Sequence, residues 1–339
     1  MHFFSSMQRY VQYSKSNRPS IVLTNKYRVM ARLDVTETFQ NIMFPGHMHT
    51  QDSLNYAVNF KFQDTDTVIV TYPKSGTTWM QEIISLVSRK GDPTFSQSQP
   101  NWARAPWLEQ YYCPQVLQAS TGPRIITTHL PYDLLAPALR DSNAKVIYVA
   151  RNPKDVAVSY YHFHKMANFL PDPGTFSEFL SDFLKGTVHY GSWFDHVKGW
   201  TGHAQNFQNF LYITYEEMWQ DLRGSVEKVS HFLQCPLTEE ELTNVQKHCS
   251  FSSMKENPMV NYTLIPQEII DHSRGKFMRK GKIGDWKNNF TEEQSDRFDA
   301  VYSSQMGDSS LLFKWDYMEE MPKPRNTIIS PLREISLCT

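Results

Sequence analysis

Short apolar runs alternate along the chain with longer segments whose apolar residues recur at helical spacing. Val68-Ile69-Val70 is a β-branched run, which is typical of a buried parallel strand. After it, Met80, Ile83 and Val87 recur at helical spacing and predict a helix to about residue 89. Strands are predicted in this way over residues 66–72, 124–131, 145–149 and 209–213. This alternation predicts one α/β domain with a mostly parallel central sheet and helices on both faces.

Local capping signals mark the beginnings of several predicted helices. Asn152 is followed by Pro153 and Asp155, the pattern of an N-cap, a first helical residue and an acidic first turn. Thr238 and Thr291 each precede a Glu or Gln by three residues and predict capping boxes. Apolar periodicity predicts further helices over 176–200, with a break near residue 191, and over 226–233.

The remaining stretches have no clear period. Residues 39–66 carry Pro, Gly and His between short apolar patches and predict a loop-rich lead-in. Residues 91–122 hold Trp102, Trp107, Tyr111 and Tyr112 between prolines, and a loop of this length commonly covers a site. Residues 1–28 are polar and aperiodic, which predicts a flexible extension. We therefore expect the folded domain over 40–320 and a C-terminal tail over 321–339.

Composition limits the classes of partner. Lys and Arg number 34 and Asp and Glu 35, so the formal charge is −1 and any basic site must be local. We therefore expect no nucleic-acid partner. The four cysteines lack metal-ligand spacing and are interpreted as free thiols of a reducing compartment. Since we find neither a signal-peptide pattern nor an 18-residue apolar run, we expect no membrane span and a cytoplasmic location.

The loop after the first strand has the features of an anion site. It places Lys74 and Gly76 between a strand and a helix, where free backbone N–H groups and the helix dipole favour negative charge. The nucleotide-triphosphate motif G-x-x-x-x-G-K-[ST] does not fit, because its first Gly is missing and Lys precedes Gly. No acidic strand end stands out as a magnesium ligand, so metal-dependent phosphoryl transfer is disfavoured.

Two further basic segments follow. Arg151 comes directly after the third strand, and Ser159 lies two turns into the next helix, where it can face the same sheet edge. Arg279 and Lys280 adjoin Gly281, where a ligand can approach the backbone. A core arginine paired with an acid and a solvent-exposed basic loop are the alternatives. Three basic loops in a chain of net charge −1 favour a ligand with two separated anionic groups.

His129 stands at the C-terminal end of the second predicted strand, after two threonines. A neutral imidazole there can accept a proton from a hydroxyl or an amine near neutral pH. A structural histidine is the alternative.

Four segments, in the order expected for the family, resemble the signatures of cytosolic sulfotransferases: residues 72–79 (YPKSGTTW), 128–131 (THLP), 151–159 (RNPKDVAVS) and 279–286 (RKGKIGDW). The resemblance spans roughly residues 44–315. It implies 3′-phosphoadenosine 5′-phosphosulfate (PAPS) as the sulfuryl donor, a P-loop-like PAPS-binding loop and no metal.

The resemblance also implies a role for individual residues. The 5′-phosphosulfate would be held by Lys74, Ser75, Gly76, Thr77 and Thr78, and the adenine would stack on Trp79. The 3′-phosphate would be held by Arg151, Ser159, Arg279, Lys280 and Gly281. The nucleoside would contact Tyr215, Cys249, Ser250 and Phe251.

By the same resemblance, His129 is the catalytic base, and Lys74 and Ser159 stabilise the leaving phosphate. The expected reaction is sulfuryl transfer to an amine or hydroxyl of a small, largely apolar acceptor, which could be an amine, a phenol, an alcohol or a sterol. A P-loop kinase and a non-catalytic nucleotide-binding module remain as alternatives.

Some positions depart from the family pattern. Thr127 stands where phenol-preferring members often carry Lys, and Cys249 replaces a usual Thr. In the dimer motif over 287–296, Glu292 replaces Val and Asp296 replaces Glu, which should weaken the homodimer.

Residues 193–200, 285–287 and 313–316 resemble the amine-sulfotransferase branch. However, Ala167 stands where catecholamine-selective members place an acid.

Overall fold

The computed structural model describes residues 35–120, 122–307, 311, 313 and 315, so the extension and the tail predicted over 1–28 and 321–339 lie outside the described residues. Its centre is a four-stranded sheet in the order β4-β3-β5-β6, with every neighbouring pair parallel. The strands are β3 (Thr67–Thr71), β4 (Ile125–Thr128), β5 (Lys145–Ala150) and β6 (Phe210–Thr214). The four predicted strands and the parallel sheet are thus confirmed.

Both faces of the sheet are buried. Successive side chains of a strand point to opposite faces, and accordingly Val68 and Val70 join one core cluster whereas Ile69 joins another. On β5, Tyr148 and Ile147 divide in the same way. Burial on both faces explains why these strands are continuous apolar runs rather than alternating ones.

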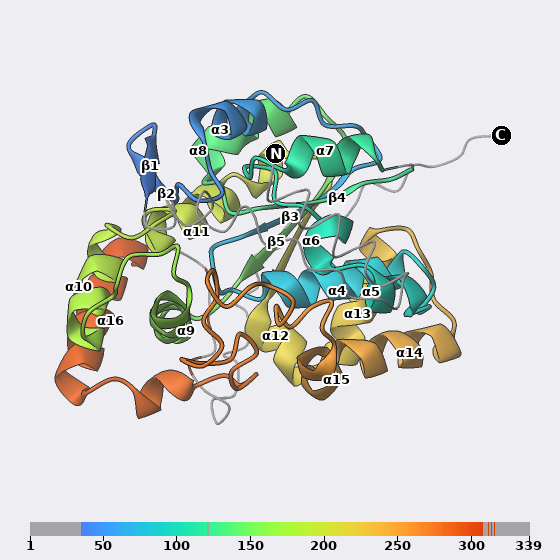
Figure 1. Ribbon diagram of the computed structural model, residues 1–339. Coiled ribbons are helices and arrows are strands. Elements are labelled where there is room, and N and C mark those ends of the chain that lie inside the picture. The colour runs from blue at the N-terminus through green and yellow to red at the C-terminus, as the bar shows by residue number, and fades with distance from the viewer. Residues whose placement is uncertain (1–34, 121, 308–310, 312, 314, 316–339) are drawn as a thin grey trace, which may run out of the picture.

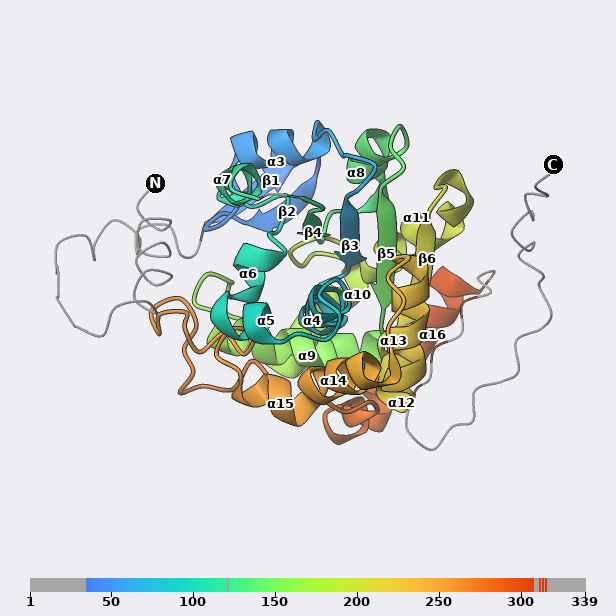
Figure 2. The ribbon, with the colours of Figure 1, turned by 90° about the vertical axis from the view of Figure 1, so that its right-hand side faces the viewer.

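Two groups of helices cover these faces, as Figures 1 and 2 show from perpendicular directions. The first group contributes to the core around Ile69 and comprises α4 (Thr77–Val87), α12 (Tyr215–Gln220), α13 (Leu222–Phe232) and α14 (Glu239–Cys249). The second contributes to the core around Val68 and comprises α3 (Gln51–Val58), α8 (Tyr132–Leu139), α9 (Pro153–Met166), α10 (Phe176–Lys185), α11 (Trp193–Gly202) and α16 (Glu292–Met306). In Figure 1, α10 and α16 lie on the left and α13 and α14 on the lower right.

The predicted helix beginnings are confirmed. The Asn152 side chain caps α9, and Pro153 is its first residue. Capping boxes open α14 at Thr238 and α16 at Thr291. The helical stretch over 176–200 is divided near the predicted position, because α10 ends at Gly186 in the left-handed conformation and α11 begins after Ser192.

Two loop predictions were wrong. The lead-in contains an antiparallel hairpin of β1 (Thr36–Phe39) and β2 (Ile42–Pro45), followed by α3. Its two-residue turn, Gln40 and Asn41, has positive φ at both positions but lacks the glycine that normally signals such a turn. The segment over 91–122 contains α5 (Thr94–Ser98), α6 (Asn101–Arg104) and α7 (Cys113–Gln118), which are too short to show a helical period.

The remaining elements are short. They are η1 (Ala204–Asn206), α15 (Phe251–Glu256) and η2 (Asp285–Asn288). Within the described part of the chain, no helix combines the length and apolar character that a membrane span requires.

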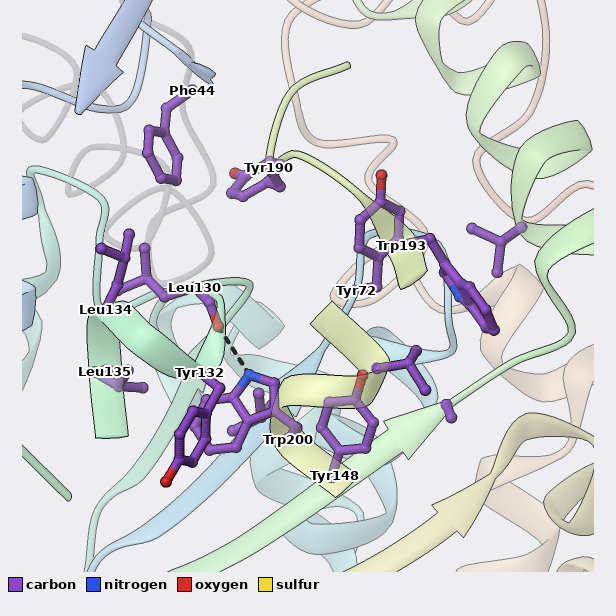
Figure 3. Close-up of a cluster of buried hydrophobic side chains, with 14 of the residues drawn as sticks. Phe44, Tyr72, Leu130, Tyr132, Leu134, Leu135, Tyr148, Tyr190, Trp193 and Trp200 are labelled. Carbon is purple, nitrogen blue, oxygen red and sulfur yellow. Dashed lines mark hydrogen bonds between the residues drawn. The ribbon is translucent and has the colours of Figure 1, made fainter. Parts of the chain in front are cut away.

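Many aromatic residues form the core beneath the carboxyl end of the sheet. Trp193, Trp200, Tyr72 and Tyr148 are fully buried there, and Figure 3 shows them gathered around the β-strands. The indole N–H of Trp200 donates to the carbonyl of Leu130 at 3.1 Å. This contact holds the chain immediately after β4, where the predicted base His129 lies.

We predict that Thr238→Ala destabilises the protein because it removes the side-chain acceptor that caps α14. The free energy of unfolding should fall by about 1 kcal/mol, as measured by urea denaturation.

Thr238→Ser is the matched control, since its hydroxyl can accept the same hydrogen bond from the Glu241 N–H. An equal loss of stability in both variants would contradict the role of the cap.

Candidate active site

Predicted site residues from distant parts of the sequence line one cavity of about 490 Å³. It lies at the carboxyl end of the parallel strands, where ligands bind in open α/β sheets. The predicted residues on its wall are Lys74, Gly76, Thr77, Thr78, Trp79, His129, Arg151, Ser159, Tyr215, Ser250, Phe251, Arg279, Lys280 and Gly281.

The loop between β3 and α4 has the backbone of an anion cradle. Lys74 has a φ of 68°, which is uncommon for a residue with a side chain. Gly76, at φ 105°, is the N-cap of α4, and no side chain caps that helix end. A Cβ at Gly76 would lie 2.9 Å from the Tyr215 ring, so the position has room only for glycine. The uncapped N–H groups of α4 are therefore free for an anion.

Lys74 supplies a positive charge beside this helix end. Its ammonium lies 4.2 Å from the ring centres of both Phe163 and Phe277, and none of the ion pairs found among the described residues involves it. Burial, together with the nearby Arg151 and Arg279 guanidinium groups, lowers the pKa of Lys74 to about 7. A cation in this setting is stabilised when an anion binds.

A second group of cations lies on the segment over 279–286 and at the end of β5. Arg151 donates to the carbonyl oxygens of Lys74 at 3.1 Å and Lys282 at 3.2 Å, and its guanidinium stacks 4.1 Å from the Tyr215 ring centre. Arg279 and Lys280 both pair with Asp285, at 2.6 and 2.5 Å. These contacts gather three cations from two segments at one side of the cavity.

His129 is oriented as a base. Its Nδ1 lies 2.8 Å from the Thr71 carbonyl oxygen and therefore carries the proton that it donates. This leaves a lone pair on Nε2, which accepts a hydrogen bond from the Trp107 indole N–H at 3.2 Å. Burial and the nearby Lys74 lower the pKa of His129 to about 4, against the opposing effect of the Thr71 carbonyl. The imidazole is thus neutral at pH 7 and can accept a proton at Nε2.

The backbone of His129 is held as well. Its N–H donates to the Glu109 carboxylate at 2.8 Å, and its carbonyl oxygen lies 3.2 Å from Nε2 of His196. Tyr148 contacts the other ring nitrogen of His196 at 2.9 Å. Burial raises the pKa of Glu109 to about 7. Sequence reasoning missed Glu109 and Thr71, because neither belongs to a motif that points to His129.

Known proteins match both the sequence and this arrangement. The sulfotransferase domain family matches residues 64–310. The chain belongs to the sulfotransferase family. It is 50% identical to sulfotransferase 2B1 of Mus musculus over 287 residues, or 84% of each chain. It is 45% identical to sulfotransferase 1C2 of Rattus norvegicus over 274 residues, 79% of this chain and 92% of that one.

Solved structures agree with this assignment. Mouse sulfotransferase SULT7A1, complexed with PAP, is 34% identical, covers 81% of this chain and 95% of its own, and has a TM-score of 0.68. Retinol dehydratase, at 24% identity and a TM-score of 0.73, covers 84% and 95% and shows the fold. Family membership makes the protein a transferase of sulfuryl groups and does not favour the kinase alternative. The likeness to the amine-sulfotransferase branch stays a prediction.

Two predicted site residues of this sulfotransferase do not line the cavity. Ser75 is buried, and its Oγ has no hydrogen-bond partner among the described residues. Cys249 is also buried, with its side chain in the core beside α4. Its carbonyl oxygen accepts the Trp79 indole N–H at 2.8 Å. Cys249 therefore positions Trp79 through the backbone, so replacing a Thr there preserves this contact.

The half of the cavity beyond His129 is aromatic and apolar. Trp102, Trp107, Tyr112, Phe163 and Phe169 line it. No Asp or Glu occurs among the cavity-lining residues that the structure describes. Over the same described ranges, no group of three or more His, Cys, Asp and Glu side chains could hold a metal ion.

We predict that affinity for 3′-phosphoadenosine 5′-phosphate (PAP) depends on the protonation of Lys74. A lowered pKa near 7 means that the ammonium is present below pH 7 and is lost above it. Binding measured by calorimetry should therefore weaken as the pH rises from 6 to 9.

Lys74→Arg is the control, because a guanidinium keeps its charge over this range. The other cations on the cavity wall of the described chain, which are Arg151, Arg279, Lys280 and Lys282, and the nearby His129 are unchanged in the variant. The same pH dependence in both proteins would contradict the assignment to Lys74.

Proposed function

We propose that this sulfotransferase transfers the sulfuryl group of PAPS to a hydroxyl or uncharged amine of a small, largely apolar acceptor. The observation that carries the proposal is the meeting of His129 and Lys74 in one cavity, between a cationic half and an aromatic half. The similarity to sulfotransferases does not favour the kinase alternative. A non-catalytic nucleotide-binding module would not need a base such as His129.

The cationic half fits a nucleotide with phosphate groups at two ends. The uncapped N-terminus of α4 and Lys74 would hold the 5′-phosphosulfate. The neighbouring Ser75, whose buried Oγ has no hydrogen-bond partner among the described residues, would assist them. Arg151 has a buried Nε without a hydrogen-bond partner in the described chain, as expected of a group that completes its bonding with a ligand. With Arg279, Lys280, Gly281 and Ser159, it would hold the 3′-phosphate. Trp79, Tyr215, Ser250 and Phe251 would contact the nucleoside.

In this proposal, PAPS supplies a sulfuryl group joined to a phosphate that is a good leaving group. His129 Nε2 accepts the proton of the acceptor hydroxyl as its oxygen attacks sulfur, and the Trp107 N–H must give way to that hydroxyl. The Thr71 carbonyl stabilises the imidazolium that forms, since it already accepts from Nδ1. Lys74, Ser159 and the N–H groups of α4 stabilise the negative charge that develops on the leaving phosphate.

The acceptor class follows from the lining of the aromatic half. An ammonium group buried there would need a counter-charge, and the cavity-lining residues of the described chain offer none. Phenols, alcohols and sterols, and amines in their uncharged form, avoid this cost. Aromatic side chains also exclude water from the reacting groups, which limits hydrolysis of the donor.

The proposal retains three expectations made from the sequence. They are a catalytic domain over 40–320, a cytoplasmic location and a weak homodimer. Glu292 and Asp296, which depart from the dimer motif, are both exposed on α16. Glu292 adds a charge where the motif has an apolar Val, which supports the expectation that the interface is weakened, whereas Asp296 keeps the charge of the Glu that it replaces.

We predict that His129→Ala binds PAP with an affinity close to that of the unmodified protein but loses about 100-fold or more of its transfer rate, because the base is absent. Transfer of ³⁵S-labelled sulfate from PAPS to a panel of phenols, sterols and amines measures this effect. The control is His203→Ala, since His203 is exposed, stacks on Tyr132 and does not line the cavity.

Full activity of His129→Ala would overturn the proposed mechanism. A phosphorylated product from ATP and magnesium would favour the kinase. PAP binding without labelled transfer to any acceptor, in the unmodified protein, would favour the non-catalytic module.

A further inference from the structure

Trp219 stands out among the aromatic side chains because it is exposed. It lies on α12, and 37% of its surface is exposed to solvent. Among the described residues, it is the only large apolar side chain that is exposed. It also lines the cavity, on the same helix as Tyr215 and Met218.

The indole N–H of Trp219 has a specific partner. It donates to the carbonyl oxygen of Gly281 at 3.0 Å. Gly281 has a φ of 62°, and a Cβ at this position would overlap the Phe251 ring. The backbone at Gly281 is thus held by Trp219 on α12 and packed against Phe251 on α15. Only glycine fits between them.

This contact holds a segment that has little structure of its own. Residues 272–284 contain neither helix nor strand. Among the described residues, the other hydrogen bonds that tie residues 281–284 to more distant parts of the protein come from Asp155 on α9 and from Arg151, two residues before that helix. Arg151 donates to the Lys282 carbonyl at 3.2 Å, and the Asp155 carboxylate accepts the Gly284 N–H at 2.7 Å. Trp219 on α12 therefore adds a third hydrogen bond to the two that Arg151 and Asp155 make with this segment.

We propose that Trp219 is a positioning residue for the 3′-phosphate of the donor, acting by holding the loop of Arg279, Lys280 and Gly281 through its indole N–H. This inference rests on the proposed function, because it requires a nucleoside 3′,5′-bisphosphate in the cationic half of the cavity. The hydrogen bond to the Gly281 carbonyl restricts the backbone of the loop, and thereby the directions of the Arg279 and Lys280 side chains. Because the loop is already ordered, it loses less conformational entropy when the phosphate binds.

The resemblance of the sequence to its family did not indicate this residue. Trp219 lies four residues after Tyr215, outside the four quoted segments, and 62 residues before its hydrogen-bond partner. An exposed aromatic residue on a short helix carries no sequence signal for such a bond.

The test compares two nucleotides that differ only in the 3′-phosphate, PAP and adenosine 5′-monophosphate. Trp219→Phe keeps an aromatic ring but removes the N–H donor. Its dissociation constant for PAP should rise roughly 3- to 10-fold, as for the loss of one hydrogen bond, with less than a twofold change for the monophosphate. In transfer assays, KM for PAPS should rise while KM for the acceptor stays the same.

Trp200→Phe is the matched control. It removes a similar indole bond to a carbonyl, that of Leu130 at 3.1 Å, within the core. Its thermal unfolding temperature should fall, but the ratio of the two dissociation constants should not change. A thermal unfolding curve for each protein separates loss of stability from loss of binding. The two nucleotides are also compared on the same Trp219→Phe protein, so a general loss of stability would affect both dissociation constants.

The outcomes are distinguishable. An equal loss of affinity for both nucleotides in Trp219→Phe, or no loss for either, overturns the inference while the proposed function stands. If the unmodified protein binds PAP no more tightly than the monophosphate, the requirement for a 3′-phosphate fails, and the proposed donor site fails with it.

Discussion

Positive charges from separate parts of the chain are concentrated at the carboxyl edge of the sheet. Lys74, Arg151 and Arg279 repel one another there, and the effect is visible in the pKa of Lys74, which burial and the two guanidinium groups lower. Such an arrangement is stable only where the backbone is held by other means. The hydrogen bonds that the Gly284 and Trp286 N–H groups donate to the Asp155 carboxylate provide part of that support.

The carboxylates of this region serve the backbone and the loop rather than the cavity. Although burial opposes it, the hydrogen bonds from Lys280 and Arg279 lower the pKa of Asp285. Asp285 therefore partly neutralises the charges of Arg279 and Lys280, although its own side chain does not line the cavity. Among the described residues, the cavity wall carries five cations, namely Lys74, Arg151, Arg279, Lys280 and Lys282, and no Asp or Glu. An anionic ligand therefore meets only cations on the wall, although two of them also pair with Asp285.

The sequence predicts those parts of the structure that depend on local physics. The four parallel strands were found because burial on both faces makes them continuous apolar runs, and the helix starts because Asn152, Thr238 and Thr291 cap within three residues. The hairpin at Gln40 and Asn41 was missed because its turn lacks glycine.

For the site, motifs indicated the cations and His129, and the structure brings them together. They did not indicate what orients them. Thr71 reaches His129 across 58 residues, and Trp219 reaches Gly281 across 62. Thr71 acts through its backbone carbonyl, which every residue has, and Trp219 acts through its indole N–H. Neither residue belongs to a sequence motif that indicates its partner. Only the fold determines that they meet.

The wall of the cationic half has a consequence for the order of events during synthesis. It is assembled from segments that begin at Lys74 and end at Lys282, more than half of the chain apart. A nascent chain on the ribosome therefore cannot complete the nucleotide site until the last of these segments has emerged. A ligand that binds only the completed site stabilises the native state by mass action. Cellular nucleotide supply would then favour finished copies of the enzyme over truncated ones.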